Sequence, residues 1–222
     1  MAAPIAYEQP TVNRAWEALL AHVPTLVLIW VGTAVVGFLG WIVQLVFSLM
    51  GYAVSSGDVF VTNIFGLASL APFLVITALL NVMFSAVPVL YYESGEVVTT
   101  RTAFAELMRR PFRYFMAGVL YFVAAILGAL LCVLPGIAVA YIGPVYVNLI
   151  FATDRPILDV FASSFQAVYR SPNGWTFVGI QFLSGLVATV VTVCTCGLAS
   201  LVVVPILAFY IQNVAYNKGV IS

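Results

Sequence analysis

Four long stretches without a charged side chain constrain this chain more than any other feature of its sequence. They cover residues 18–57, 59–92, 114–153 and 171–217, which are 40, 34, 40 and 47 residues long in turn. A helix that crosses the hydrocarbon core of a bilayer needs about 20 predominantly apolar residues. The whole chain is 64% hydrophobic and only 7% charged, whereas soluble domains are about 25% charged. We therefore expect an integral membrane protein rather than a soluble or a disordered chain.

The lengths of these stretches predict the number of membrane spans. Each of the first two stretches holds one span, and each of the last two holds a pair, divided at 134–136 and at 194–197. We therefore expect an all-α, polytopic membrane protein that forms a single domain over residues 1–222, with six transmembrane helices in three hairpins. The predicted spans are 25–53, 60–91, 113–132, 135–153, 173–193 and 197–216.

The positive charges predict the orientation of these spans. All eight Lys and Arg residues fall on the same side of a six-span topology, and the opposite loops carry only Asp58 as a charged residue. Lys and Arg in short loops accumulate on the cytoplasmic side of a membrane. Both termini are therefore expected to be cytoplasmic.

The segments before the three hairpins resemble one another. Each has helical periodicity with one apolar and one polar face, and each contains an aromatic residue (Trp16, Phe104 or Phe165) seven or eight residues before a proline. The proline is expected to open the next helix, and amphipathic helices of this kind lie in the plane of the membrane interface. We interpret the chain as three internal repeats, each an interfacial helix followed by two spans. The repeats cover about 11–92, 101–154 and 157–217.

Short motifs spread over most of the chain carry a resemblance to a known family. They are Ala15-Trp16, the LPGI sequence at 134–137, the helix at 159–170, Gly174-Trp175, and Cys196-Gly197 before Pro205. In these motifs the chain resembles a bacterial group of multi-pass membrane proteins related to the membrane domain of glycerophosphodiester phosphodiesterases. The resemblance implies a bacterial cytoplasmic (or other inner) membrane. The group's soluble phosphodiesterase domain is absent from this sequence, so the resemblance transfers no activity and no functional residue.

The residue types that carry chemistry are sparse. His22 is the only histidine and is expected to be solvated at the membrane surface, and the spans contain no ionisable residue that would mark a proton path. We find no nucleophile with a base and no glycine-rich phosphate loop, and the balanced charge leaves no basic face for nucleic acid. We therefore expect no catalytic residue, no cofactor and no metal site, and we do not expect an enzyme. Whether the cysteines near the outer ends of the spans form a disulfide or stay small buried thiols is open; they are Cys132, Cys194 and Cys196.

Two sets of residues are candidates for binding. The first is a basic run with neighbouring aromatic residues, which would contact anionic lipid or an acidic partner surface or would serve only to orient the chain; it comprises Arg109, Arg110, Arg113, Trp16, Phe104 and Phe112. The second is a set of amides in the spans, which would line a polar cavity or only join helices by hydrogen bonds; it comprises Asn81, Asn148, Gln181 and Gln212.

These candidates favour a non-catalytic scaffold or accessory subunit that contacts the lipid bilayer and other membrane-protein subunits. The alternative is a transporter of a small solute or a lipid, with a path between the three hairpins. The two hypotheses differ in one structural respect. A scaffold should have a closely packed centre, whereas a transporter should gather the four amides around a cavity.

Overall fold

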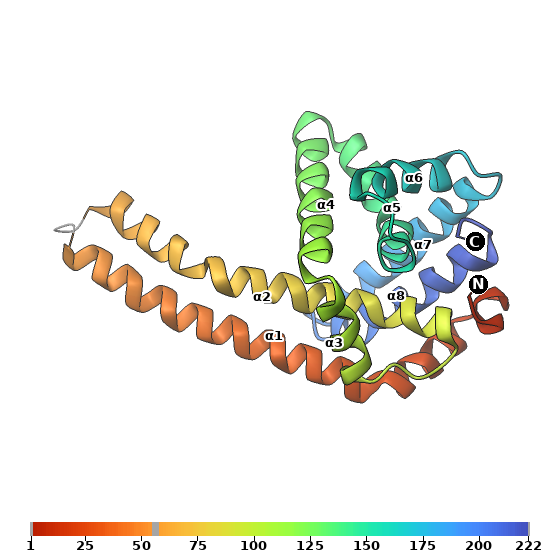
Figure 1. Cartoon of the computed structure of the whole chain (residues 1–222), viewed down its shortest axis with the longest axis horizontal. Coiled ribbons are helices and arrows are strands. Elements are labelled where there is room, and N and C mark those ends of the chain that lie inside the picture. The colour runs from red at the N-terminus through yellow and green to blue at the C-terminus, as the bar shows by residue number, and fades with distance from the viewer. Residues whose placement is uncertain (1, 55–57, 222) are drawn as a thin grey trace.

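The computed structural model describes residues 2–54 and 58–221, and these fold almost entirely into helices (Figure 1). Six of the helices are apolar and long enough to cross a membrane. They are α1 (Val12–Val54), α2 (Val59–Ser94), α4 (Pro111–Leu131), α5 (Val133–Ala152), α7 (Gly174–Cys194) and α8 (Ser200–Asn217). The shorter helices are η1 (Pro4–Tyr7), α3 (Thr100–Arg109) and α6 (Ile157–Tyr169). The prediction of an all-helical fold with six apolar, span-length helices is confirmed.

Local sequence signals explain where several helices begin and end. The carboxylate of Asp58 caps α2 by accepting hydrogen bonds from the N–H groups of Phe60 (2.8 Å) and Val61 (3.2 Å). Gly95 ends α2 in the left-handed conformation, at a φ of 75°, which a glycine adopts without a steric penalty. Pro111 occupies the first turn of α4, where the missing N–H of proline removes no helical hydrogen bond.

The first hairpin differs from the other two because the amphipathic segment before it is not a separate helix. The amphipathic segment and the first span form one continuous helix with Pro24 inside it, whereas α3 and α6 are separate helices. A proline inside a helix removes one backbone hydrogen bond, here the one to the carbonyl of Leu20. Side chains on both sides of this gap are anchored to a distant loop, because His22 and Thr25 both bond to the backbone of Val98. These tertiary bonds hold α1 in place across the proline.

The six long helices form the hairpins α1–α2, α4–α5 and α7–α8. The α1–α2 hairpin and α4 extend in different directions from a common region, where both termini also lie (Figure 1). We call this region the base; it comprises η1, residues 12–25 of α1, α3, α6 and the adjoining ends of the other long helices. At the base α2, α5 and α8 contact one another, α3 contacts α1 and α2, and α6 contacts α4 and α5. The internal repeat itself stays a prediction.

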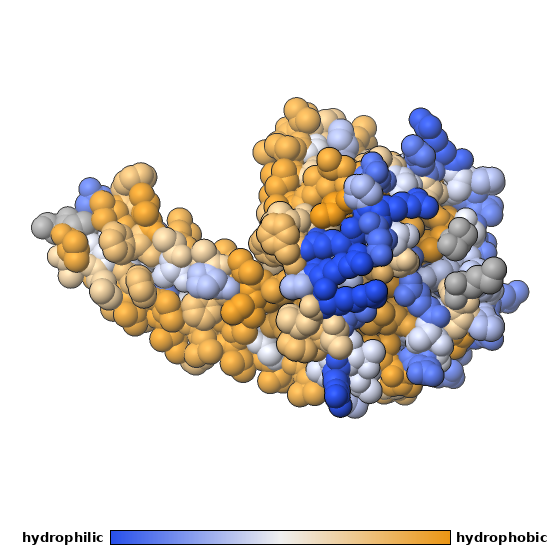
Figure 2. Space-filling view, in the orientation of Figure 1, coloured by the Kyte–Doolittle hydropathy of each residue, from blue (hydrophilic) through white to orange (hydrophobic). Residues whose placement is uncertain are grey.

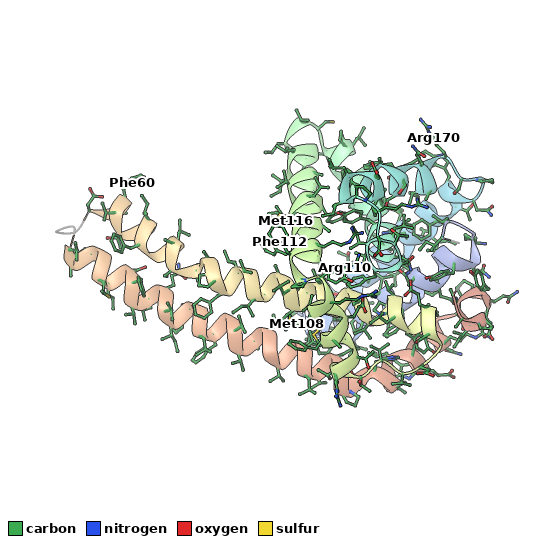
Figure 3. All side chains as sticks on the ribbon, in the orientation of Figure 1. Phe60, Met108, Arg110, Phe112, Met116 and Arg170 are labelled. Carbon is green, nitrogen blue, oxygen red and sulfur yellow. The ribbon has the colours of Figure 1, made fainter. Side chains whose placement is uncertain are left out.

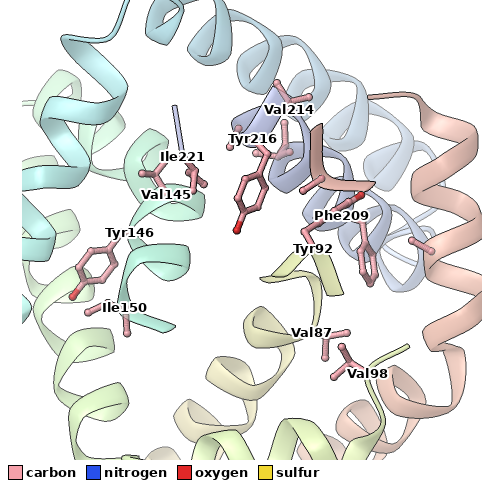
Figure 4. Close-up of a cluster of buried hydrophobic side chains, with 14 of the residues drawn as sticks. Val87, Tyr92, Val98, Val145, Tyr146, Ile150, Phe209, Val214, Tyr216 and Ile221 are labelled. Atoms are coloured by element: carbon pink, nitrogen blue, oxygen red, sulfur yellow. The ribbon is translucent and has the colours of Figure 1, made fainter. Parts of the chain in front are cut away.

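The hydrophobic core lies at the base, where side chains from several hairpins meet (Figure 4). Val87 from α2, Val145 from α5 and Val214 from α8 are completely buried. The ring of Phe209 on α8 packs edge-on against Tyr91 of α2, with ring centroids 5.8 Å apart. The base is therefore a closely packed, mainly apolar region in which all three hairpins take part.

The hairpins remain apolar on the surfaces that they do not bury. Phe38 and Trp41 on α1 are exposed by 61% and 57%, and Leu130 and Leu131 at the end of α4 by 78% and 84%. Figure 2 shows this apolar surface along the α1–α2 hairpin and around α4, and a hydrophilic patch at the base. A soluble monomer does not expose apolar surface on this scale. A bilayer accommodates it at no hydrophobic cost, because lipid chains are as apolar as the side chains.

Candidate functional site

The positive charges of the chain are confined to the base side of the hairpins. Residues 15–100, 114–154 and 171–217, which include the three hairpin tips, contain no Lys or Arg. The N-terminal segment is held at the base as well, because the Nδ2 of Asn213 donates to the carbonyl of Ala6 at 2.8 Å. The ion pair of Arg14 with Glu8, at 2.8 Å, lies in the same region. The cations of the chain therefore lie outside the tips of its apolar hairpins.

Two arginines at the start of α4 join this helix to the loop after α5. Arg110 forms an ion pair with Asp154, and its hydrogen bond lowers the pKa of the Asp154 carboxyl group. The guanidinium of Arg113 donates to the carbonyl oxygens of Thr153 at 2.8 Å and Arg155 at 2.7 Å. These bonds satisfy carbonyl groups that follow the end of α5, where a helix leaves its last carbonyls unpaired.

The third arginine, Arg109, is more exposed than Arg110. Its side chain is 64% exposed, and its guanidinium lies 3.8 Å from the carboxylate of Glu106, a long separation at which an ion pair near the surface contributes little. Glu106 is engaged elsewhere, because it accepts a hydrogen bond of 2.8 Å from the hydroxyl of Tyr114. Of the three arginines, Arg109 is the one whose guanidinium is most accessible to a ligand.

The predicted aromatic residues lie on the outside of the base. Phe104 on α3 is 53% exposed, Phe112 on α4 is 74% exposed, and Trp16 on α1 is 43% exposed. Phe104 and Phe112 flank Arg109 and Arg110 along the chain, and Figure 3 shows Phe112 on the side of α4 that faces the α1–α2 hairpin. Trp16 belongs to a different helix. Phe104 and Phe112 thus present exposed apolar rings near Arg109 and Arg110 along the chain, as expected for side chains at a membrane interface.

The four predicted amides do not surround one cavity in the described part of the chain. Asn148 is buried and its Nδ2 donates to the hydroxyl of Tyr216 at 2.7 Å. Gln212 is buried one helical turn before Tyr216, on the same helix. Asn81 is on the exposed side of α2, where it donates to the carbonyl of Thr77 at 3.0 Å. Gln181 lies on α7.

Three of the four candidate amides keep a buried polar atom without a hydrogen-bond partner. These atoms are the Oδ1 of Asn148, the Oε1 of Gln181 and the Nε2 of Gln212. A buried amide that pairs only one of its two polar groups loses free energy, about 1–3 kcal/mol for each unpaired group. Asn148 and Gln212 are thus buried polar groups within a mainly apolar core.

The prediction that His22 is solvated at the membrane surface is wrong. It is completely buried, not solvated. Its Nδ1 lies 2.7 Å from the carbonyl oxygen of Ala18, and its Nε2 accepts a hydrogen bond of 2.9 Å from the N–H of Val98. Accepting at Nε2 requires the proton to sit on Nδ1, so the two bonds select one neutral tautomer.

The surroundings of His22 keep it neutral. Its ring lies 5.0 Å from that of Tyr91 and 5.1 Å from that of Phe209. His22 precedes the predicted first span, and burial lowers its pKa below the usual value of 6.5. Both backbone polar groups of the loop residue Val98 are hydrogen-bonded to α1, because its N–H donates to His22 and its carbonyl accepts from the hydroxyl of Thr25 at 2.9 Å. No local signal marks this contact, since His22 and Val98 are 76 residues apart.

A groove of about 690 Å³ opens between α2, α4 and α5. Apolar and aromatic side chains make most of its wall, and Asn81, Ser85 and Tyr114 are among its polar members. A second, smaller hollow of about 230 Å³ lies at the base beside Glu8, Arg14 and Tyr92. Neither is lined by Asn148, Gln181 or Gln212.

The cysteines lie at the tips of the second and third hairpins. Cys132 follows α4, Cys194 ends α7 and Cys196 lies in the turn before α8. All three are free thiols, and all three are exposed rather than buried. Within residues 2–54 and 58–221, no three His, Cys, Asp or Glu side chains lie close enough together to hold a metal ion.

Comparison of the chain with protein-family models, with curated proteins and with solved structures gave no match.

Proposed function

We propose that this protein is a non-catalytic scaffold or accessory subunit of a membrane assembly. Its six apolar helices make it an integral membrane protein. The proposal for its role is supported by one observation above all: the centre of the base is filled by side chains. His22, Tyr91 and Phe209 pack ring against ring there, and the candidate amides are dispersed over three regions of the fold.

A transport path would need a different arrangement of the same residues. Asn81 and Gln181 would have to share a cavity with the buried amides of α5 and α8. Instead, the hydrogen bond between Asn148 and Tyr216 ties α5 directly to α8. Buried polar groups that join helices in this way stabilise a helix assembly by about 0.6 kcal/mol each on average. This use of the amides favours a fixed scaffold over a pair of rocking halves.

The proposal includes an orientation and a family relationship. Both termini lie at the base, and every Lys and Arg lies outside the three uncharged hairpin stretches of the sequence, so the positive-inside rule favours a cytoplasmic base. We further propose a bacterial cytoplasmic membrane, on the basis of the family resemblance described above.

The experiment that tests the scaffold proposal is purification from the native membrane in a mild detergent, followed by mass determination of the intact particle. We expect a companion subunit at a fixed stoichiometry. A matched sample of Asn148→Leu tests the alternative, because removing a scaffold's internal amide should leave the companion bound. A monomeric particle without a companion, from either sample, would contradict the proposal.

A further inference from the structure

The groove between the first and second hairpins is suited to an extended apolar ligand. Its volume of about 690 Å³ falls within the range of about 300–1,000 Å³ that is usual for ligand sites. Its polar members already have partners in the protein: Asn81 donates to the carbonyl of Thr77 and Ser85 to that of Asn81, each at 3.0 Å, and the hydroxyl of Tyr114 donates to Glu106. The wall is therefore mainly apolar, and its polar side chains do not need a ligand as a hydrogen-bond partner.

The groove is open at the exposed apolar surface of α2 and α4. Leu74 on α2 and Phe122 on α4 line it and are 62% and 65% exposed. The groove arises because α2 and α4 diverge from the base (Figure 1). An apolar space of this kind is not stably hydrated, so in a bilayer a hydrocarbon chain fills it.

The base end of the groove adjoins positive charge. Tyr114, which lines the groove, directly follows Arg113 in the first turn of α4. Arg110 lies four residues before Tyr114, and Arg109 five residues before it, with a side chain that is 64% exposed. Figures 2 and 3 together show a hydrophilic patch around Arg110 that borders the apolar surface of α4. Cations at the headgroup level attract anionic lipids.

Two carboxylates, Glu106 and Asp154, partly offset these cations. Asp154 is paired with Arg110, and Glu106 accepts the hydroxyl of Tyr114. A third carboxylate, Glu93, lies near Glu106, so three carboxylates balance the three arginines in formal charge. Arg109 has an exposed side chain and only a 3.8 Å contact with Glu106, so it is the cation that remains for a negative headgroup.

We propose that the groove between α2, α4 and α5 is a specific site for one anionic phospholipid. One acyl chain lies along the groove from Tyr114 towards Phe122, and the phosphate lies beside Arg109 and Arg110. The site goes beyond the scaffold proposal, because its existence does not depend on a protein partner.

The first arm of the test addresses the headgroup. Delipidated protein in detergent is titrated with dioleoylphosphatidylglycerol or with dioleoylphosphatidylcholine, and retained lipid is counted by native mass spectrometry. We expect one phosphatidylglycerol to be retained in preference to phosphatidylcholine. Replacing Arg109 and Arg110 by Gln should weaken phosphatidylglycerol binding about fivefold for each arginine removed, whereas Arg170→Gln, a distant arginine of the base, should change nothing.

The second arm addresses the acyl chain. Gly118 lines the groove, and a Cβ added there meets no atom within 4 Å. Gly118→Leu therefore places an apolar side chain in the groove, and it should reduce retention of both lipids. Gly179→Leu on α7 is the matched control, because that exposed glycine is equally open and is not among the residues that line the groove.

Three results would overturn the proposal. They are equal retention of both lipids by the wild type, unchanged phosphatidylglycerol binding in Gly118→Leu, and equal losses in Gly118→Leu and Gly179→Leu. Loss of a companion protein from Gly118→Leu with unchanged lipid retention would assign the groove to a partner's transmembrane helix instead. A protein without any companion that still retains phosphatidylglycerol selectively would refute the scaffold proposal and leave the lipid site standing.

Discussion

The contact between His22 and Val98 predicts how the stability of this protein depends on pH. His22 is neutral in the folded protein and accepts the N–H of Val98 at Nε2. Burial removes the protonated ring from water, which is why the pKa of His22 is lowered from 6.5. Protonation at Nε2 would also remove the acceptor for the N–H of Val98. In the unfolded chain His22 titrates near its ordinary pKa of about 6.5. The unfolded state therefore binds more protons in the window between the two values.

The sign and size of the effect follow from this difference. The stabilisation by neutral His22 is fully present above about pH 6.5 and is lost as the pH falls towards the lower pKa of the folded state. Its slope is at most about 1.4 kcal/mol per pH unit. The replacement His22→Phe keeps an aromatic ring against Tyr91 and Phe209 but leaves the buried N–H of Val98 unpaired. We expect it to cost about 1–3 kcal/mol at pH 8.

The assay is reversible unfolding of the purified protein in detergent at a series of pH values from 8 to 5. The difference between wild type and His22→Phe isolates His22, because all other titrating groups are common to both proteins. This difference should shrink as the pH falls below 6.5. Thr25→Val, which removes the other side-chain bond to Val98, should give a pH-independent loss. A difference between wild type and His22→Phe that stays constant from pH 8 to 5 would refute the reasoning.

Three further predictions test other parts of the structure. Burial and the nearby Glu106 raise the pKa of Glu93, so the folded state binds the Glu93 proton more tightly than the unfolded state and loses stability as the pH rises. Glu93→Gln should therefore raise the Tm at pH 7 and not at pH 4. Equal Tm shifts at the two pH values would contradict this. A Cβ on Gly136 would lie 2.9 Å from the Cα of Ala129, so Gly136→Ala should lower the free energy of unfolding by roughly 1–3 kcal/mol. Gly179→Ala should not lower it. Equal free energies of unfolding for the two variants would refute the close approach of α4 and α5. A membrane-impermeant maleimide added to intact cells should label the three exposed cysteines of the hairpin tips; protection of all three would overturn the proposed orientation.

The six apolar helices of this protein could be predicted from the sequence because their determinants are local. The length of each uncharged stretch sets the number of spans, and the ends that we predicted for α2 and α4–α8 lie within three residues of the observed ones. Caps and breakers such as Asp58, Gly95 and Pro111 act within one turn of their own position. The clustering of all cations on one side of the topology is likewise a property of the chain order alone.

Contacts between distant residues were decided only by the tertiary structure. Pro24 is typical of the start of a helix, yet α1 continues through it, because His22 and Thr25 anchor this part of the helix to Val98. The amide of Asn148 meets Tyr216, 68 residues away, while Asn81 and Gln181, which are also amides in long apolar helices, take no part in that contact. The groove exists because α2 and α4 diverge, which no span prediction contains. Hydropathy records whether a segment prefers lipid to water, and this preference is nearly the same for every face of these helices. Which helix packs against which therefore depends on side-chain shape and on a few hydrogen bonds that form only when the hairpins meet.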